Sequence, residues 1–264
     1  IALATAQGDH PSASLPDACA DPARLKAAYR VYDNAACPPA ALLERHSQAP
    51  DQRVRQGPLV LAVNATSFLD WTQHPATTGL GPLATIHQQG LRRHPTLAFT
   101  PDRVPLGLLG QDLWARAAAT FGKQADQHDR PLAEQESRTW RDSLAAVNAA
   151  AAACPTTRFI QVSDAEADVY DLLVAERAAT VEVLVRAGQD RRVETDERSL
   201  WPALRQAPVV SQVELLLPRP PDRPARRVTL AVGWRAVTLR PPRKRAKEHR
   251  PPVSLGAVLA TERD

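Results

Sequence analysis

The 264-residue sequence has no methionine, only three cysteines and no long apolar run. Without a methionine the chain has no start residue, so we expect its N-terminal end to be cut. Three cysteines, far apart and odd in number, form no metal-binding spacing and no evident disulfide framework, which is typical of a reducing cytoplasm. No apolar stretch is long enough to span a bilayer, and residues 1–10 lack the pattern of a signal peptide. The sequence therefore favours a cytoplasmic protein with no membrane partner.

What the chain does contain is enough apolar material for a sizeable core. Hydrophobic residues make up 44% of it, which is typical of a globular protein, and its length suits one large domain or two smaller ones. The formal net charge is +4, which permits binding to nucleic acid without being diagnostic of it.

One stretch, residues 159–171, organises the rest of the chain. Phe159 to Val162 read as a buried strand, Asp164 ends that strand, and apolar residues at helical spacing predict a helix over 166–178. A carboxylate at the carboxyl end of a central strand lies where open α/β sheets bind ligands. The alternative is that Asp164 only caps the following helix.

The order of the predicted elements indicates a fold. A buried strand over 58–64 ends at Asn64, a hairpin of two strands follows over 95–100 and 104–114, and a long helix covers 137–154. A strand over 159–164, a helix over 166–178 and a strand over 181–185 come next. This is the order of a ribonuclease-H-like α/β fold, a mixed sheet with flanking helices. The first strand and the strand after the long helix then lie side by side, so we expect Asn64 and Asp164 to point at one shared spot.

The segments on either side of this core have a different character. Residues 1–57 read as helical, with helices beginning at Pro22 and Pro39, and their interspersed basic residues either touch DNA phosphates or form a solvated layer. Residues 188–264 read as an antiparallel β insertion with basic loops, cut at its C-terminal end just after an apolar run. The densest basic run, 240–250, is either solvated or in contact with phosphates through Arg243, Lys244 and Arg245.

Five segments in the right order resemble one family. They lie at 26–34, 60–74, 79–83, 136–140 and 162–170, and they include Asp-Ala-Glu-Ala-Asp-Val-Tyr at 164–170 and Glu-Ser-Arg-Thr-Trp at 136–140. The chain resembles DNA transposases of bacterial insertion sequences in the group related to transposon Tn-five, which carry an Asp-Asp-Glu catalytic set on a ribonuclease-H-like core.

The resemblance implies a function and its partners. In such a protein, carboxylates hold two Mg²⁺ ions that activate water or a DNA 3′-hydroxyl for cut-and-paste displacement at transposon ends. The full-length parent would work as a homodimer on paired ends, in the bacterial cytoplasm at the nucleoid. Asp164 matches the second catalytic and metal-binding position. DNA-binding positions would include Tyr29, Arg30, Arg186, Arg191 and Arg192.

The sequence departs from the family pattern at two places. Asn64 stands where the first catalytic Asp is expected, and an amide has lost the negative charge that balances the metal ions. The third carboxylate belongs to a helix beyond the β insertion, and the chain ends before it. We therefore expect a transposase fragment with an incomplete core and no activity; the alternatives are a non-catalytic DNA-binding remnant and an inert pseudogene product.

Overall fold

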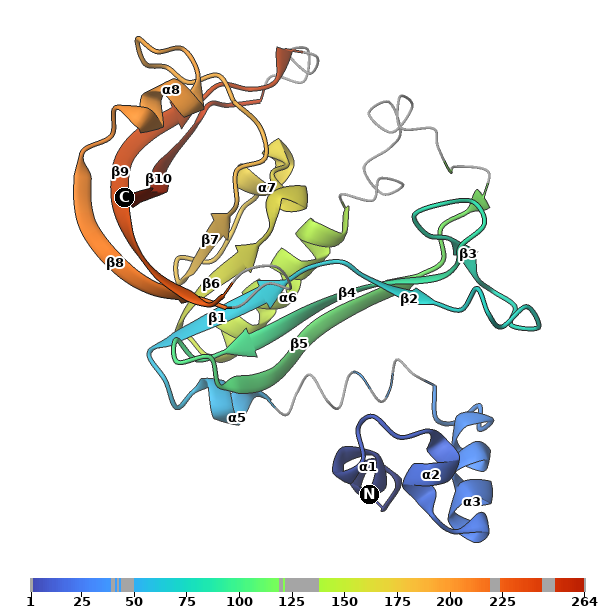
Figure 1. Cartoon of the computed structure of the whole chain (residues 1–264). Helices are drawn as coiled ribbons and strands as arrows, with labels where there is room; N and C mark the ends of the chain where they lie inside the picture. Colours follow the sequence, from blue (N-terminus) through green and yellow to red (C-terminus); the bar gives the residue numbers. More distant parts are fainter. Residues whose placement is uncertain are drawn as a thin grey trace.

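The computed structural model describes residues 2–38, 41, 43, 50–118, 121, 138–218, 224–243 and 250–263. These residues form a group of N-terminal helices, a mixed sheet with its helices, and a second sheet of three strands (Figure 1). None of the described helices combines the length and the apolar character needed to cross a membrane. The predicted α/β class, with a ribonuclease-H-like mixed sheet, is confirmed.

The N-terminal helices begin with clear capping residues. Asp21 accepts a hydrogen bond from the Ala23 N–H at 3.0 Å and Pro22 occupies the first turn, so the helix predicted to begin at Pro22 is confirmed. The helix predicted to begin at Pro39 lies mostly outside the described residues. The helices of this part are α1 (Ala2–Asp9), α2 (Leu15–Cys19) and α3 (Pro22–Tyr32). A further short helix, α5 (Pro50–Val54), lies apart from them beside the central sheet, and its Val54 belongs to the core of that sheet (Figure 1).

The central sheet has the strand order β5-β4-β1-β6-β7, with two short strands, β2 and β3, added along β4. Strands β1, β6 and β7 are parallel, whereas β4 is antiparallel to both β1 and β5. The predicted hairpin and the predicted pairing of the first strand with the strand after the long helix are both confirmed. The strands are β1 (Leu59–Asn64), β2 (Ser67–Asp70), β3 (Gly81–Pro82), β4 (Gln89–Phe99), β5 (Pro105–Trp114), β6 (Arg158–Ser163) and β7 (Val181–Val185).

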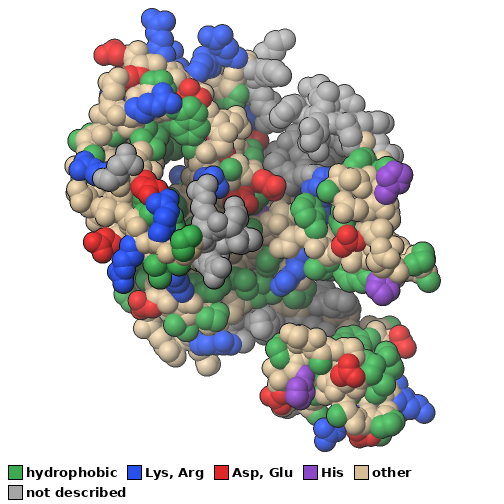
Figure 2. All heavy atoms as spheres, in the orientation of Figure 1, with side chains coloured by type: hydrophobic (Ala, Val, Ile, Leu, Met, Phe, Trp, Pro, Cys, Tyr) green, Lys and Arg blue, Asp and Glu red, His purple; other side chains and the backbone are tan. Residues whose placement is uncertain are grey.

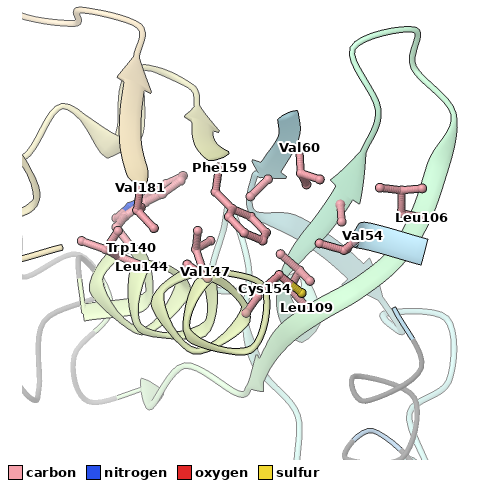
Figure 3. Packing of buried hydrophobic residues seen from close by; sticks show 14 of the residues in the cluster. Val54, Val60, Leu106, Leu109, Trp140, Leu144, Val147, Cys154, Phe159 and Val181 are labelled. Carbon is pink, nitrogen blue, oxygen red and sulfur yellow. The ribbon is translucent and has the colours of Figure 1, made fainter. Parts of the chain in front are cut away.

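One face of this sheet packs against α6 (Arg138–Ala153), the predicted long helix. Trp140 and Leu144 project from α6 toward Val181 of β7, and Val147 projects toward Phe159 of β6 (Figure 3). Each such side chain contributes about 1.5–3 kcal/mol when fully buried. This packing holds the carboxyl ends of β1 and β6 in a fixed position.

The helix predicted over 166–178 is wrong in its extent. A 3-10 turn covers Ala165–Ala167, and the following α-helix, α7, spans only Tyr170–Leu173. The chain leaves helical geometry at Asp168, where φ is −70° and ψ is 61°. The Asp168 carbonyl oxygen accepts hydrogen bonds from the side chains of Gln189 and Arg191 instead of from a helical N–H.

The second sheet has the order β10-β9-β8, all antiparallel, as predicted for the insertion. Its central strand is continuous through Gly233. A helix that was not predicted, α8, packs with Tyr170 of α7 and with β9 in a second apolar cluster. The elements are α8 (Leu200–Arg205), β8 (Val209–Leu217), β9 (Arg226–Leu239) and β10 (Val253–Arg263).

Candidate nucleic-acid interface

Asn64 ends β1 directly beside the end of β6. It is paired in register with Ser163 and is only 2% exposed. The Ser163 hydroxyl donates a hydrogen bond of 2.6 Å to Asn64 Oδ1, whereas Asn64 Nδ2 has no partner in the described part of the chain. The residue at the predicted first catalytic position is therefore neutral and buried, and its side-chain oxygen already accepts a hydrogen bond.

Asp164 follows β6 and is exposed. Its Oδ1 accepts a hydrogen bond of 2.9 Å from the Glu166 N–H, so Asp164 is the N-cap of the 3-10 turn. The capping alternative therefore describes its geometry. A cap leaves the second carboxylate oxygen available to other ligands, and a role of Asp164 in metal binding stays a prediction.

His94 is a buried polar residue of this region that sequence reasoning missed. It is 1% exposed on β4, its Nδ1 lies 3.0 Å from Thr66 Oγ1, and its ring meets Trp140 edge-on at 4.4 Å between centroids. Burial lowers the pKa of His94, while the charges of Asp112 and Asp164 act in the opposite direction. His94 is therefore neutral at pH 7. The signal in the sequence was its position, because His94 lies two and four residues before Thr96 and Ala98 and so on the same, buried face of β4.

The described residues do not fit a magnesium site. No group of three His, Cys, Asp or Glu side chains among them is placed to hold a metal ion. Asn64 adds no charge, and Asp164 is a single carboxylate that already caps a turn. Mg²⁺ prefers a set of oxygen ligands that includes carboxylates. The chemistry that the resemblance implies at these two positions is therefore not supported by this donor set.

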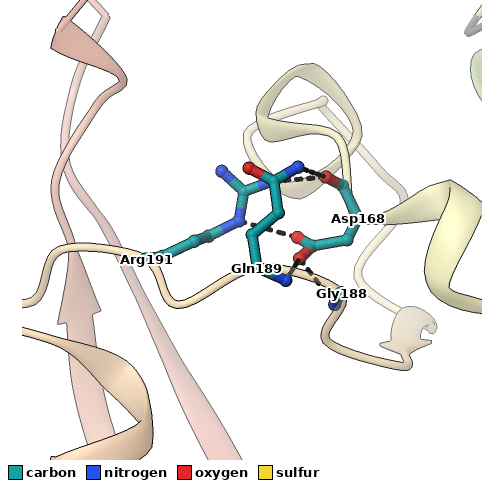
Figure 4. Close-up of polar contacts among 4 residues, drawn as sticks. All are labelled: Asp168, Gly188, Gln189 and Arg191. Carbon is teal, nitrogen blue, oxygen red and sulfur yellow. Dashed lines mark hydrogen bonds and ion pairs between the residues drawn. The ribbon is translucent and has the colours of Figure 1, made fainter.

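A buried carboxylate that sequence reasoning also missed, Asp168, holds the loop that follows β7 (Figure 4). Its Oδ2 accepts hydrogen bonds from the backbone N–H groups of Gly188 at 2.9 Å and Gln189 at 3.0 Å. Its Oδ1 pairs with Arg191 Nε at 2.7 Å, and the two side chains are only 5% and 9% exposed. A Cβ on Gly188 would lie 3.1 Å from the Ala165 carbonyl oxygen, so this loop packs closely against the turn after Asp164.

The three arginines of this loop, which the sequence analysis treated alike, have different environments. Arg191 is ion-paired with Asp168 and its side chain is 9% exposed, so most of its surface is taken up within the fold, and a contact of Arg191 with DNA stays a prediction. Arg186 is exposed directly after β7, and its backbone N–H donates to the Ser163 carbonyl at 3.1 Å. Arg192 donates through Nη2 to the Pro241 carbonyl at 2.6 Å and so joins this loop to the second basic loop.

The second basic loop is described only at its beginning and its end. Arg243 is exposed, and the remaining predicted phosphate contacts, Lys244 and Arg245, lie outside the described residues. Arg250 at the far end of the loop is ion-paired with Asp171 of α7.

The predicted DNA-contacting pair on α3 lies on the surface. Tyr29 is 51% exposed and Arg30 is exposed beside it, while Ala28 faces the interior of the helical group. Tyr32, one turn further along, is 56% exposed. An aromatic ring next to a cation on an open helix face can stack on a sugar or base and contact a phosphate.

Comparison with known proteins identifies this N-terminal part. Residues 1–37 match the family described as transposase DNA-binding, and the match covers α1, α2 and α3. No curated protein matches the chain. The N-terminal helices are therefore similar to a transposase DNA-binding domain.

Proposed function

We propose that this chain binds DNA in the manner of a transposase and that its contact begins on α3, with Tyr29 and Arg30. The match of residues 1–37 to a transposase DNA-binding family carries the proposal. The exposure of Tyr29 and Arg30 on the matched helices supports it, because a DNA-contacting side chain must be accessible.

The proposal includes an origin in a cut-and-paste transposase, because a ribonuclease-H-like sheet follows the matched helices. Transposon ends are then the natural DNA partner, and the full-length parent would act as a homodimer. Cleavage is not part of the proposal for this chain. Asn64 and Asp164 offer one carboxylate between them, so no metal-dependent cleavage is proposed at these two positions.

The test is fluorescence anisotropy with a labelled DNA duplex over a range of salt concentrations. Phosphate contacts predict binding that weakens steeply with salt, and Arg30→Ala should reduce the slope of log K against log [salt] by about one. Tyr29→Ala should weaken binding with little change in slope, because it removes no charge. Arg103→Ala is the control, since Arg103 is an exposed arginine in the turn between β4 and β5.

Two results would contradict the proposal. Binding that does not depend on salt, or no binding by a chain that unfolds cooperatively, would show that the chain is not a DNA-binding protein. Failure to unfold cooperatively would favour an inert pseudogene product instead.

A further inference from the structure

A hollow of about 480 Å³ lies between the loop before α8 and the end of β9. Most of its lining side chains are basic, and basic side chains also gather over this end of the molecule, next to α8 (Figure 2). We refer to it as the arginine pocket, and its lining residues are Arg192, Val193, Thr195, Asp196, Arg198, Arg240 and Arg243.

The charges of the arginine pocket are not balanced by its own acids. Four arginines face one lining acid, Asp196. Arg240 has an exposed and long ion pair with Glu194, at 3.7 Å, whereas none of the other three arginines is ion-paired within the described part of the chain. Arg192 donates one hydrogen bond, from Nη2 to the Pro241 carbonyl oxygen. Because a guanidinium has five N–H donors, other donors of Arg192 remain for a ligand.

The backbone around the pocket is held by its own hydrogen bonds. Arg192 accepts from the Arg240 N–H at 2.9 Å, and Glu194 donates to the Thr238 carbonyl at 2.9 Å, which fixes one wall against the other. Arg198 has a φ of 60°, in the left-handed region that non-glycine residues rarely adopt. Such strain is retained where the surrounding structure enforces it, often at binding sites.

We propose that the arginine pocket is a phosphate-binding site. Planar guanidinium groups match phosphate oxygens in pairs of parallel hydrogen bonds, and several of them around one hollow favour an anion of more than one charge. The volume is in the range of pockets that hold a small molecule or a nucleotide-sized group. On the proposed DNA-binding function the occupant is a phosphate of the DNA backbone; a free polyphosphate has the same chemistry.

The site extends the predicted set of phosphate contacts. Arg192 and Arg243 were expected to bind DNA, and Arg240 begins the predicted basic run 240–250, whereas Arg198 was not singled out. Arg192 also follows directly on Arg191, which Asp168 holds in place. A phosphate in the pocket would therefore be held at a fixed distance from the end of β6.

The first test is isothermal titration of the full chain with inorganic pyrophosphate at low ionic strength. Arg198→Ala and Arg240→Ala should each weaken binding by about tenfold, the value of one hydrogen bond to a charged group. Asp196→Asn should tighten binding, by about threefold, because it removes the one acid from the lining. Arg103→Ala is a closely matched control, since Arg103 is also exposed and also has a left-handed backbone, with a φ of 68°.

One further variant and Asp196→Asn separate binding from folding. Arg198→Gly removes the guanidinium and also relieves the left-handed strain, so its melting temperature should equal or exceed that of the parent while pyrophosphate binding falls. Loss of folding could not explain the tighter pyrophosphate binding that we expect for Asp196→Asn.

Comparing pyrophosphate binding with DNA binding identifies the source of the phosphate. If the arginine variants weaken pyrophosphate binding and also lower the salt slope for a DNA duplex, the occupant is a DNA phosphate. If they weaken only pyrophosphate binding, the occupant is a free polyphosphate. No pyrophosphate binding by the parent, or equal binding by parent and variants, overturns the proposal, whatever the result for Tyr29 and Arg30 on DNA.

Discussion

Removing the charge of Asp168 should destabilise the chain more than any surface substitution. Its carboxylate accepts three hydrogen bonds, from the N–H groups of Gly188 and Gln189 and from the buried guanidinium of Arg191. Removing one partner of a buried ion pair costs about 3–5 kcal/mol, because the other charge stays buried without compensation. We expect this loss for Asp168→Ala, and about 1.5–3 kcal/mol for Asp168→Asn, which keeps the shape and one acceptor.

The measurement is the free energy of unfolding in urea, followed by circular dichroism. The double variant Asp168→Asn/Arg191→Met should recover part of the loss, because it leaves no unpaired buried charge. Glu182→Gln is the control: Glu182 forms an ion pair of similar length with Arg158, at 2.6 Å, but both side chains are more than half exposed, so the change should be below about 1 kcal/mol. A loss below about 0.5 kcal/mol for Asp168→Ala would refute the argument, since that is the range of ordinary surface substitutions.

Two further predictions concern a depressed pKa and the absent charge at Asn64. The neighbouring Thr195 hydroxyl and the Arg235 guanidinium lower the pKa of Glu197 to about 2 from 4.5, so its carboxylate stabilises the fold above pH 4.5 and loses this effect as the pH falls toward 2. Glu197→Gln should therefore melt lower than the parent at pH 7, and thermal melts between pH 4.5 and 2 should show the gap closing; a gap that is independent of pH would contradict this assignment. Asn64→Asp should leave the chain unable to nick supercoiled plasmid with Mg²⁺, because among the described residues no group of three His, Cys, Asp or Glu side chains is placed to hold a metal ion; nicking that Asp164→Ala abolishes would overturn this prediction.

Local sequence patterns were sufficient for most of the elements and for the main neighbour relation of the sheet. A continuous apolar run marked β1, an apolar and β-prone run marked β6, and helical spacing marked α6. The order of these elements, which is that of a ribonuclease-H-like fold, then placed β1 beside β6 and Asn64 next to the end of β6. The N-terminal helix was equally predictable, since Asp21 and Pro22 are a cap and a first-turn residue.

Only the tertiary structure decided which charges are exposed and which are buried. Arg186, Arg191 and Arg192 look alike in the sequence, yet Arg191 is buried against Asp168, 23 residues earlier, and this contact also ends the predicted helix. The arginine pocket likewise depends on chain segments that meet through hydrogen bonds between the loop before α8 and β9. Hydrophobic periodicity indicates the secondary structure of a segment and its buried face, because both depend on residues close in the sequence. The partner of a buried charge is set by contacts between distant segments.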